Sequence, residues 1–250
     1  MTNAKNILDF INSFAPFDTQ MSFDNSGLLT GDENAVSDKI IVTLDVTRKV
    51  IEQAVSENAG IIISHHPVIF NPIKSLLSSS VPFLCAKNGL TVISAHTNLD
   101  IAPNGVNDTL AKLCGVVPDK YLNDDCLIFG HLPSTMDCPT FARYIKNSLN
   151  ISGLRFSDSG KNISKIAVAC GAGGNNVFLA RKYSADAIIT GEIKHHEIIF
   201  ANDNNIAVFD LGHFNSENII IPELVKKLSE QFPDITFIES NFTDKMNYIN

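Results

Sequence analysis

The sequence predicts an α/β protein made of two interlinked α/β lobes with mixed sheets. In the first half, residues 38–47 have the pattern of a strand, 48–60 that of an amphipathic helix, and 61–67 begin as a buried strand. The same order of strand, helix and strand recurs over residues 163–192. This order is typical of a sheet covered by helices, and 250 residues with 44% hydrophobic content can bury a sizeable core.

Further segments extend this pattern on both sides of an irregular middle. Residues 81–89 predict a helix, and residues 90–100 predict a strand that becomes polar at its end. After the middle, one more strand is expected over 206–213 and one helix over 217–232.

The boundary between the lobes is expected in the middle of the chain, where Pro118, Pro133 and Pro139 interrupt the pattern around one predicted helix. We therefore expect a first lobe over 1–125 and a second over 126–250. Within the second, the segment 211–250 is expected to return to a site between the lobes.

Charge and cysteine content limit the classes of protein. The net charge of -8 and the absence of basic runs argue against nucleic acid as a primary partner. The N-terminus lacks the apolar run of a signal peptide, and no stretch is apolar enough to span a membrane. Five cysteines without a C-x-x-C pair suit free thiols in a reducing compartment, so we expect a cytoplasmic protein without a cysteine zinc site.

Histidines and carboxylates gather where predicted strands end. His65 and His66 follow the apolar run 61–63, at a position where neighbouring side chains can reach two ions a few ångströms apart. Taken alone, the pair is better explained as a hydrogen-bonded core histidine beside a surface one, and the further clusters shift the interpretation toward metal ligands. His96 and Asp100 follow the next strand, and His213 and Glu217 follow a later one.

The sequence around Glu217 also predicts a helix start. Ser216 or Asn215 is expected to cap the helix over 217–232 and to leave Glu217 in its first turn, with His213 just before it. Imidazoles mixed with carboxylates are typical of a dinuclear site for Zn, Fe, Mn, Co or Ni. Two such ions would leave the pocket positive and suited to a small anionic substrate.

The chain resembles the Nif-three-like family of dinuclear-metal hexamers, whose members are named homologues of GTP cyclohydrolase 1 type 2. Six segments carry the resemblance over nearly the whole chain. They are Phe23-Asp24-Asn25-Ser26-Gly27-Leu28, Leu44-Asp45-Val46-Thr47, Ser64-His65-His66-Pro67-Val68-Ile69-Phe70, His96-Thr97-Asn98-Leu99-Asp100, Thr190-Gly191-Glu192 and Gly212-His213-Phe214-Asn215-Ser216-Glu217. The family usually has tryptophan where this chain has Phe23, and some members carry a long middle insertion that is missing here.

This resemblance implies two divalent metal ions per chain, with His96 close to them, and a ring-shaped homohexamer. The implied ligands are His65, His66, Asp100, His213 and Glu217.

Two functions follow as hypotheses. The first is a metal-dependent hydrolase of the GTP cyclohydrolase type, acting on a nucleotide or another small phosphorylated or heterocyclic substrate, with His96 or Glu192 as proton donor. The second is a non-catalytic metal-binding scaffold or regulatory protein.

Some features keep two interpretations. The glycine-rich segment 171–174 fits either a phosphate-binding loop or a tight turn between strand and helix. His195 and His196 lie on a predicted helix, where they are poorly placed to chelate one ion together but can still face the pocket. We expect His131 to be structural and Cys170 to be a buried free thiol.

Overall fold

The computed structural model describes residues 2–244, so the last six residues of the expected second lobe lie outside the described part. The chain forms two compact units. Of the described residues, the first unit combines 2–103 with 220–243, and the second contains 104–219. Each unit has its own mixed sheet, which confirms the predicted fold class. No helix within 2–244 is long and apolar enough to cross a membrane.

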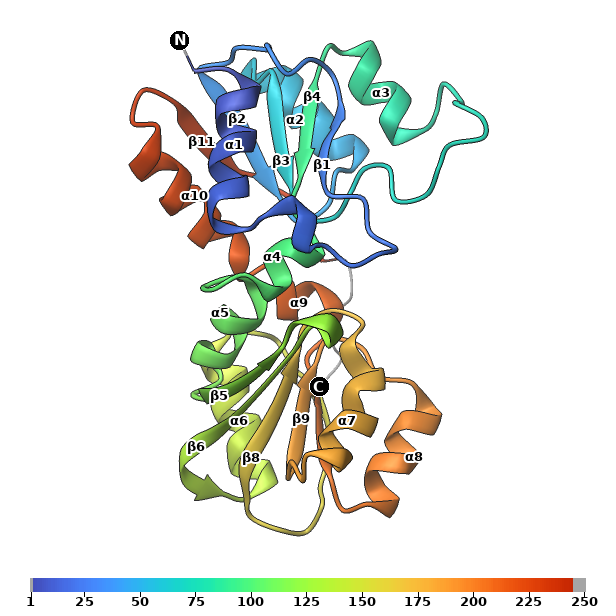
Figure 1. Ribbon diagram of the computed structural model, residues 1–250, viewed down its shortest axis with the longest axis vertical. Coiled ribbons are helices and arrows are strands. Elements are labelled where there is room, and N and C mark those ends of the chain that lie inside the picture. Colours follow the sequence, from blue (N-terminus) through green and yellow to red (C-terminus); the bar gives the residue numbers. More distant parts are fainter. Residues whose placement is uncertain (1, 245–250) are drawn as a thin grey trace. The chain divides into compact units, whose positions relative to one another are not determined.

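The first unit contains a five-stranded sheet in the order β1-β4-β3-β2-β11 (Figure 1). Strands β4, β3, β2 and β11 are parallel, whereas the edge strand β1 is antiparallel to β4. The elements are α1 (Ala4–Phe14), a 3-10 turn (Phe17–Thr19), β1 (Gly27–Thr30), β2 (Lys39–Thr43), α2 (Arg48–Glu57), β3 (Ile61–Ser64), α3 (Val81–Lys87), β4 (Thr91–Ser94), α4 (Thr97–Ile101), α10 (Ile220–Gln231) and β11 (Thr236–Glu239).

The core of the first unit follows from strands that are apolar on both faces. One face contributes Ile41, Ile62 and Val92 to a cluster with residues of α2 and α3. Figure 1 shows α1 and α10 on the other face. Local signals set the helix ends: the Thr47 side chain accepts a hydrogen bond from Val50 N at the start of α2, and Asn58 ends it in the left-handed conformation.

The second unit contains a six-stranded sheet in the order β5-β6-β8-β9-β10-β7. Its central strands β8, β9 and β10 are parallel, and the outer pairs are antiparallel. The elements are α5 (Val106–Leu113), β5 (Val117–Leu122), a 3-10 turn (Asn123–Asp125), β6 (Leu127–Met136), α6 (Cys138–Ser148), β7 (Arg155–Ser157), β8 (Ile163–Ala169), a 3-10 turn (Gly173–Asn176), α7 (Val177–Lys182), β9 (Ala187–Thr190), α8 (His195–Asp203), β10 (Ala207–Asp210) and α9 (His213–Glu217).

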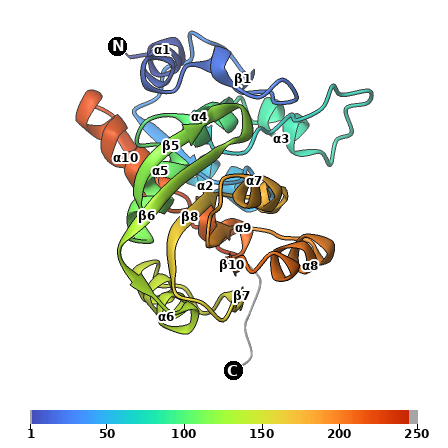
Figure 2. The same ribbon diagram turned by 60° about the horizontal axis from the view of Figure 1, so that its bottom comes forward.

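Helices cover both faces of this second sheet, with α6 on one side and α7 and α8 on the other (Figure 2). On the α7 and α8 side, Ala167, Ile188 and Val208 belong to one buried cluster. On the opposite side, the ring of Phe141 from α6 packs edge to face on Phe209 of β10 at 5.1 Å.

The division of the chain differs from the expected lobes 1–125 and 126–250. The units divide at Pro103/Asn104, because α5 packs on β5, β6 and β8 of the second sheet. The segment expected to return, 211–250, is split: 211–219 stays with the second unit, whereas α10 and β11 join the first. Strand β11 does so because it pairs in parallel with β2, from Thr236 to Glu239.

Candidate metal centre

Three parallel strands of the first unit end together. Strands β2, β3 and β4 are in register at Thr43, Ser64 and Ser94. The hydroxyls of Ser64 and Ser94 lie 2.8 Å apart and join two of these ends. Because the carboxyl ends of parallel strands meet at one edge of a sheet, the residues that follow them are brought side by side.

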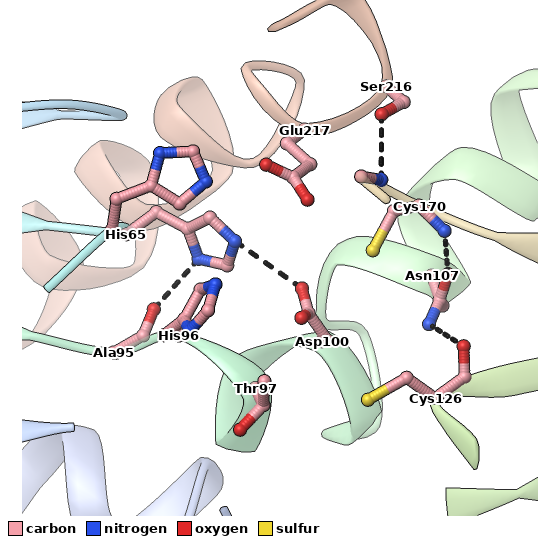
Figure 3. Close-up of polar contacts among 12 residues, drawn as sticks. His65, Ala95, His96, Thr97, Asp100, Asn107, Cys126, Cys170, Ser216 and Glu217 are labelled. Carbon is pink, nitrogen blue, oxygen red and sulfur yellow. Dashed lines mark hydrogen bonds and ion pairs between the residues drawn. The ribbon is translucent and has the colours of Figure 1, made fainter. Parts of the chain in front are cut away.

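Those following residues form a cluster of histidines. The ring centroids of His65 and His66 are 5.1 Å apart, and His96 lies 5.1 Å from the first and 5.4 Å from the second. Each ring offers one nitrogen, and these three atoms lie within 4.8 Å of one another, so the group could hold a metal ion. Nε2 of His65 is also 3.4 Å from Oδ1 of Asp100. Figure 3 marks this contact with a dashed line.

The Nδ1 atom of each of these histidines contacts an oxygen acceptor. Nδ1 of His65 is 2.8 Å from the carbonyl oxygen of Ala95, which can only accept, so this nitrogen carries the proton. Nδ1 of His66 is 2.8 Å from Asp45, and Nδ1 of His96 is 2.8 Å from Asp24. In a neutral imidazole this leaves the Nε2 lone pair for a metal ion, the arrangement usual for metal-binding histidines.

Asp24 holds several groups of the cluster in place. Its carboxylate accepts hydrogen bonds from the backbone N–H and the hydroxyl of Thr97 as well as from His96. Burial alone would raise the pKa of Asp24, but the hydrogen bonds from His96 and Thr97 outweigh burial and lower this pKa well below its usual value. Asp24 is therefore an ionised acceptor that fixes the orientation of the His96 ring.

In the second unit, the parallel strands β8, β9 and β10 are in register at Ala169, Thr190 and Asp210. The short helix α9 follows β10 and carries His213 and Glu217. Their spacing of four residues places both on one face of the helix. Nε2 of His213 lies 3.0 Å from Oε2 of Glu217, and its Nδ1 lies 2.7 Å from Oε1 of Glu192.

The predicted helix cap at Ser216 or Asn215 is wrong. Gly212 precedes α9, and the longer helix α10 begins only at Ile220. The Ser216 hydroxyl instead donates to the carbonyl oxygen of His213 and accepts from Gly171 N, a contact drawn in Figure 3. Because α9 forms this separate turn of helix, His213 and Glu217 lie on one face of it.

Close approach explains the glycines around this helix. Gly171 has φ +55, and a Cβ atom there would lie 2.0 Å from Oε1 of Glu217. At Gly191 a Cβ atom would lie 2.4 Å from the Ser216 hydroxyl. At the start of the glycine-rich segment, the N–H of Gly171 donates to Ser216, and the N–H of the preceding Cys170 donates to Asn107. These contacts favour a tight turn that supports α9 over a phosphate-binding loop.

The remaining histidines lie outside both groups. His195 and His196 begin α8 and are exposed, so their helical placement agrees with the prediction. His131 is half-buried, and its Nδ1 lies 2.8 Å from Oδ2 of Asp119. Cys170 is buried, and no disulfide involves the five free cysteines.

The structure thus brings the predicted residues together as two sets, one in each unit. The first contains His65, His66, His96 and Asp100, and the second contains His213 and Glu217 with Glu192. Sequence reasoning assigned no site role to Asp24 or Asp45, although both lie in segments that carry the family resemblance. Both accept a hydrogen bond from an imidazole Nδ1.

The donor atoms suit borderline and hard divalent cations. Imidazole nitrogens and carboxylate oxygens bind Zn, Fe, Mn, Co and Ni, whereas thiolates, which select softer ions, are missing from these described groups. Asp100 and Glu217 are 6% and 3% exposed, and a carboxylate so deeply buried is stabilised by positive charge nearby. The residues therefore fit divalent metal ions.

The chain is similar in sequence and in fold to several known proteins. The chain is 35% identical over 238 residues to a Clostridium acetobutylicum protein named GTP cyclohydrolase 1 type 2 homolog, covering 90% of this chain and 88% of that protein. It is 32% identical to the Helicobacter pylori protein named GTP cyclohydrolase 1 type 2, with 90% and 92% covered. A Staphylococcus aureus crystal structure matches with a TM-score of 0.87 at 27% identity over 99% of both chains.

The sequence model of one family, described as Duf34/NIF3 (NGG1p interacting factor 3), matches residues 2–246 and so includes every segment discussed above. The chain therefore belongs to the Duf34/NIF3 family.

Proposed function

We propose that this chain is a hydrolase that depends on two divalent metal ions. The proposed ligands are His65, His66 and Asp100 from the first unit, and His213 and Glu217 from the second. The observation that carries the proposal is the common state of the three histidine ligands. Each has an oxygen acceptor at Nδ1, so Nε2 is the nitrogen that would bind an ion.

Bound divalent ions would supply Lewis acidity and lower the pKa of a water molecule. The residues of the chain determine the net charge of the site and therefore the charge of the substrate that it favours. Two carboxylates bring a charge of about -2 against about +4 from two ions, so the site is positive although the chain as a whole is at -8. A small anionic substrate is favoured by that local charge.

The substrate class proposed is a nucleotide or another small phosphorylated or heterocyclic compound. The names of the Clostridium and Helicobacter relatives support GTP as the first compound to test. Opening of the guanine ring at C8 with release of formate requires a proton donor as well as a nucleophilic water. His96 is the better-placed candidate, because the exposed Glu192 carboxylate accepts a hydrogen bond from His213.

The test combines metal content with turnover. Elemental analysis of gently purified protein should give close to two divalent ions per chain, and the loaded protein should release formate from GTP or hydrolyse another nucleotide, folate or phosphoester. A chelator should abolish the activity. Metal content near zero after incubation with Zn, Mn, Fe or Co would refute the metal centre, whereas two ions without turnover on any substrate would favour the scaffold function.

We further propose that the chain assembles as a homohexamer, which rests on the family resemblance. Light scattering should give a mass near six times 27.3 kDa. A monomer mass at micromolar concentration would contradict the assembly and leave the metal proposal intact.

A further inference from the structure

Two exposed aromatic side chains lie beside the histidine cluster of the first unit. Phe23 is 63% exposed and Phe70 is 42% exposed, although burying a ring of this size is favourable. The ring centroids are 6.3 Å apart with an interplanar angle of 49°. The Phe70 ring in turn lies 6.1 Å from the ring of His96 at 79°. An aromatic surface therefore extends from the exposed Phe23 through Phe70 to His96 of the histidine cluster.

Hydrogen bonds hold this pair in place. Asn25 donates from Nδ2 to the carbonyl oxygen of Ile69 at 2.6 Å, which joins the segment of Phe23 to that of Phe70. Next to it, Asp24 accepts from His96. Phe23 thus neighbours Asp24, which is bonded to His96, and Phe70 neighbours Ile69, which is bonded to Asn25. Because both segments are already held in place, the two rings lose little conformational freedom when a ligand binds.

We propose that Phe23 and Phe70 form a stacking platform for the heterocyclic base of a nucleotide. This inference rests on the proposed function, since it concerns the substrate of the same site. A base between two rings needs them parallel and roughly 7–8 Å apart, twice an ordinary contact of about 3.5–4.0 Å. The observed rings are closer and tilted, so the base stacks on the exposed ring of Phe23, while Phe70 supports that ring from the side of His96.

The chain contains no tryptophan, which makes a direct test available. Phe23→Trp introduces one reporter at the platform and preserves an aromatic face. GTP added to the metal-loaded variant should quench its emission, because the base stacks on the indole. Ribose 5-phosphate and inorganic triphosphate, which lack a base, should leave the emission unchanged. Phe178→Trp is the matched control: Phe178 is 46% exposed and packs on Phe200 in the other unit.

Calorimetry measures GTP binding to the variants without relying on fluorescence. Phe23→Leu keeps an apolar side chain but removes the π face, and should weaken GTP binding about 5- to 140-fold by calorimetry. Phe23→Trp should bind at least as tightly as the parent chain. Metal content should be unchanged in both variants, because neither removes a ligand.

The outcomes separate this inference from the proposed function. Quenching by GTP in Phe23→Trp alone supports the platform, even if no hydrolysis is found. Equal quenching in the Phe178→Trp control, or unchanged GTP affinity in Phe23→Leu, overturns it, even if the protein carries two ions and hydrolyses a nucleotide.

Discussion

Gly171 offers the sharpest test of how the second unit positions Glu217. A Cβ atom at this residue would lie 2.0 Å from Oε1 of Glu217 and 3.4 Å from Nε2 of His213. Side chains essentially never approach a Cβ closer than 3.0 Å, so the carboxylate in Gly171→Ala must move by about 1 Å or more. Glu217 is only 3% exposed, so the surrounding residues leave it little room to do so.

The expected result is a large loss of metal affinity. Removing a residue that merely orients a metal ligand costs about 10- to 100-fold in affinity. Displacing Glu217, a proposed ligand itself, should cost at least as much. The left-handed backbone at φ +55 adds a stability penalty of roughly 1–2 kcal/mol for any side chain.

Gly160→Ala is the matched control for this backbone penalty. Gly160 has φ +69 and nothing within 4 Å of an added Cβ, so only the penalty applies. It should lower the melting temperature by roughly 2–8 °C while metal content stays unchanged. Elemental analysis after dialysis and thermal melting would measure both quantities. Equal metal content in the two variants would refute the argument that close packing at Gly171 holds Glu217 in place.

Three further predictions follow from the structure. Asp100→Ala should lose bound metal and activity together, because it removes a proposed ligand. Glu192→Gln keeps an oxygen acceptor for His213 and should therefore retain both ions. A fall in turnover without loss of metal in Glu192→Gln would identify Glu192 as the proton donor. Burial raises the pKa of the Cys114 thiol to about 12, so at pH 8 only about 10⁻⁴ of this thiol is ionised. Mass spectrometry should therefore find Cys114 unmodified by iodoacetamide until the protein is denatured. The pKa of Asp24 is lowered in the folded state, so its ionised carboxylate should stabilise the metal-free fold above about pH 4. This contribution is lost as the pH falls toward the lowered pKa. The stability of Asp24→Asn should therefore depend less on pH below about 4 than that of the parent chain.

Each of these has a clear contrary outcome. Full activity in a metal-depleted Asp100→Ala protein would exclude metal-assisted catalysis. Rapid alkylation of native Cys114 would mean that its surroundings open readily. Identical acid unfolding curves for Asp24→Asn and the parent chain would show that the carboxylate contributes equally to the folded and unfolded states.

The sequence by itself predicted the regular strands and the residues that follow them. Strands β2, β3, β8 and β9 are short apolar runs that end at polar residues, and such a pattern is local. Local sequence also predicted α3 and α6. The middle was poorly predicted, because β5, β6 and β7 are half-exposed strands that depend on pairing with partners distant in sequence.

Only the tertiary structure decided how the candidate ligands are oriented and which unit holds them. The pairing of Asp24 with His96 spans 72 residues, and that of Glu192 with His213 spans 21, so neither has a local signal. The division at Pro103/Asn104 likewise depends on α5 packing against one sheet and β11 pairing with the other. Residue types and strand ends are properties of short segments, whereas tautomer, orientation and unit membership arise from contacts that exist only after the chain has folded.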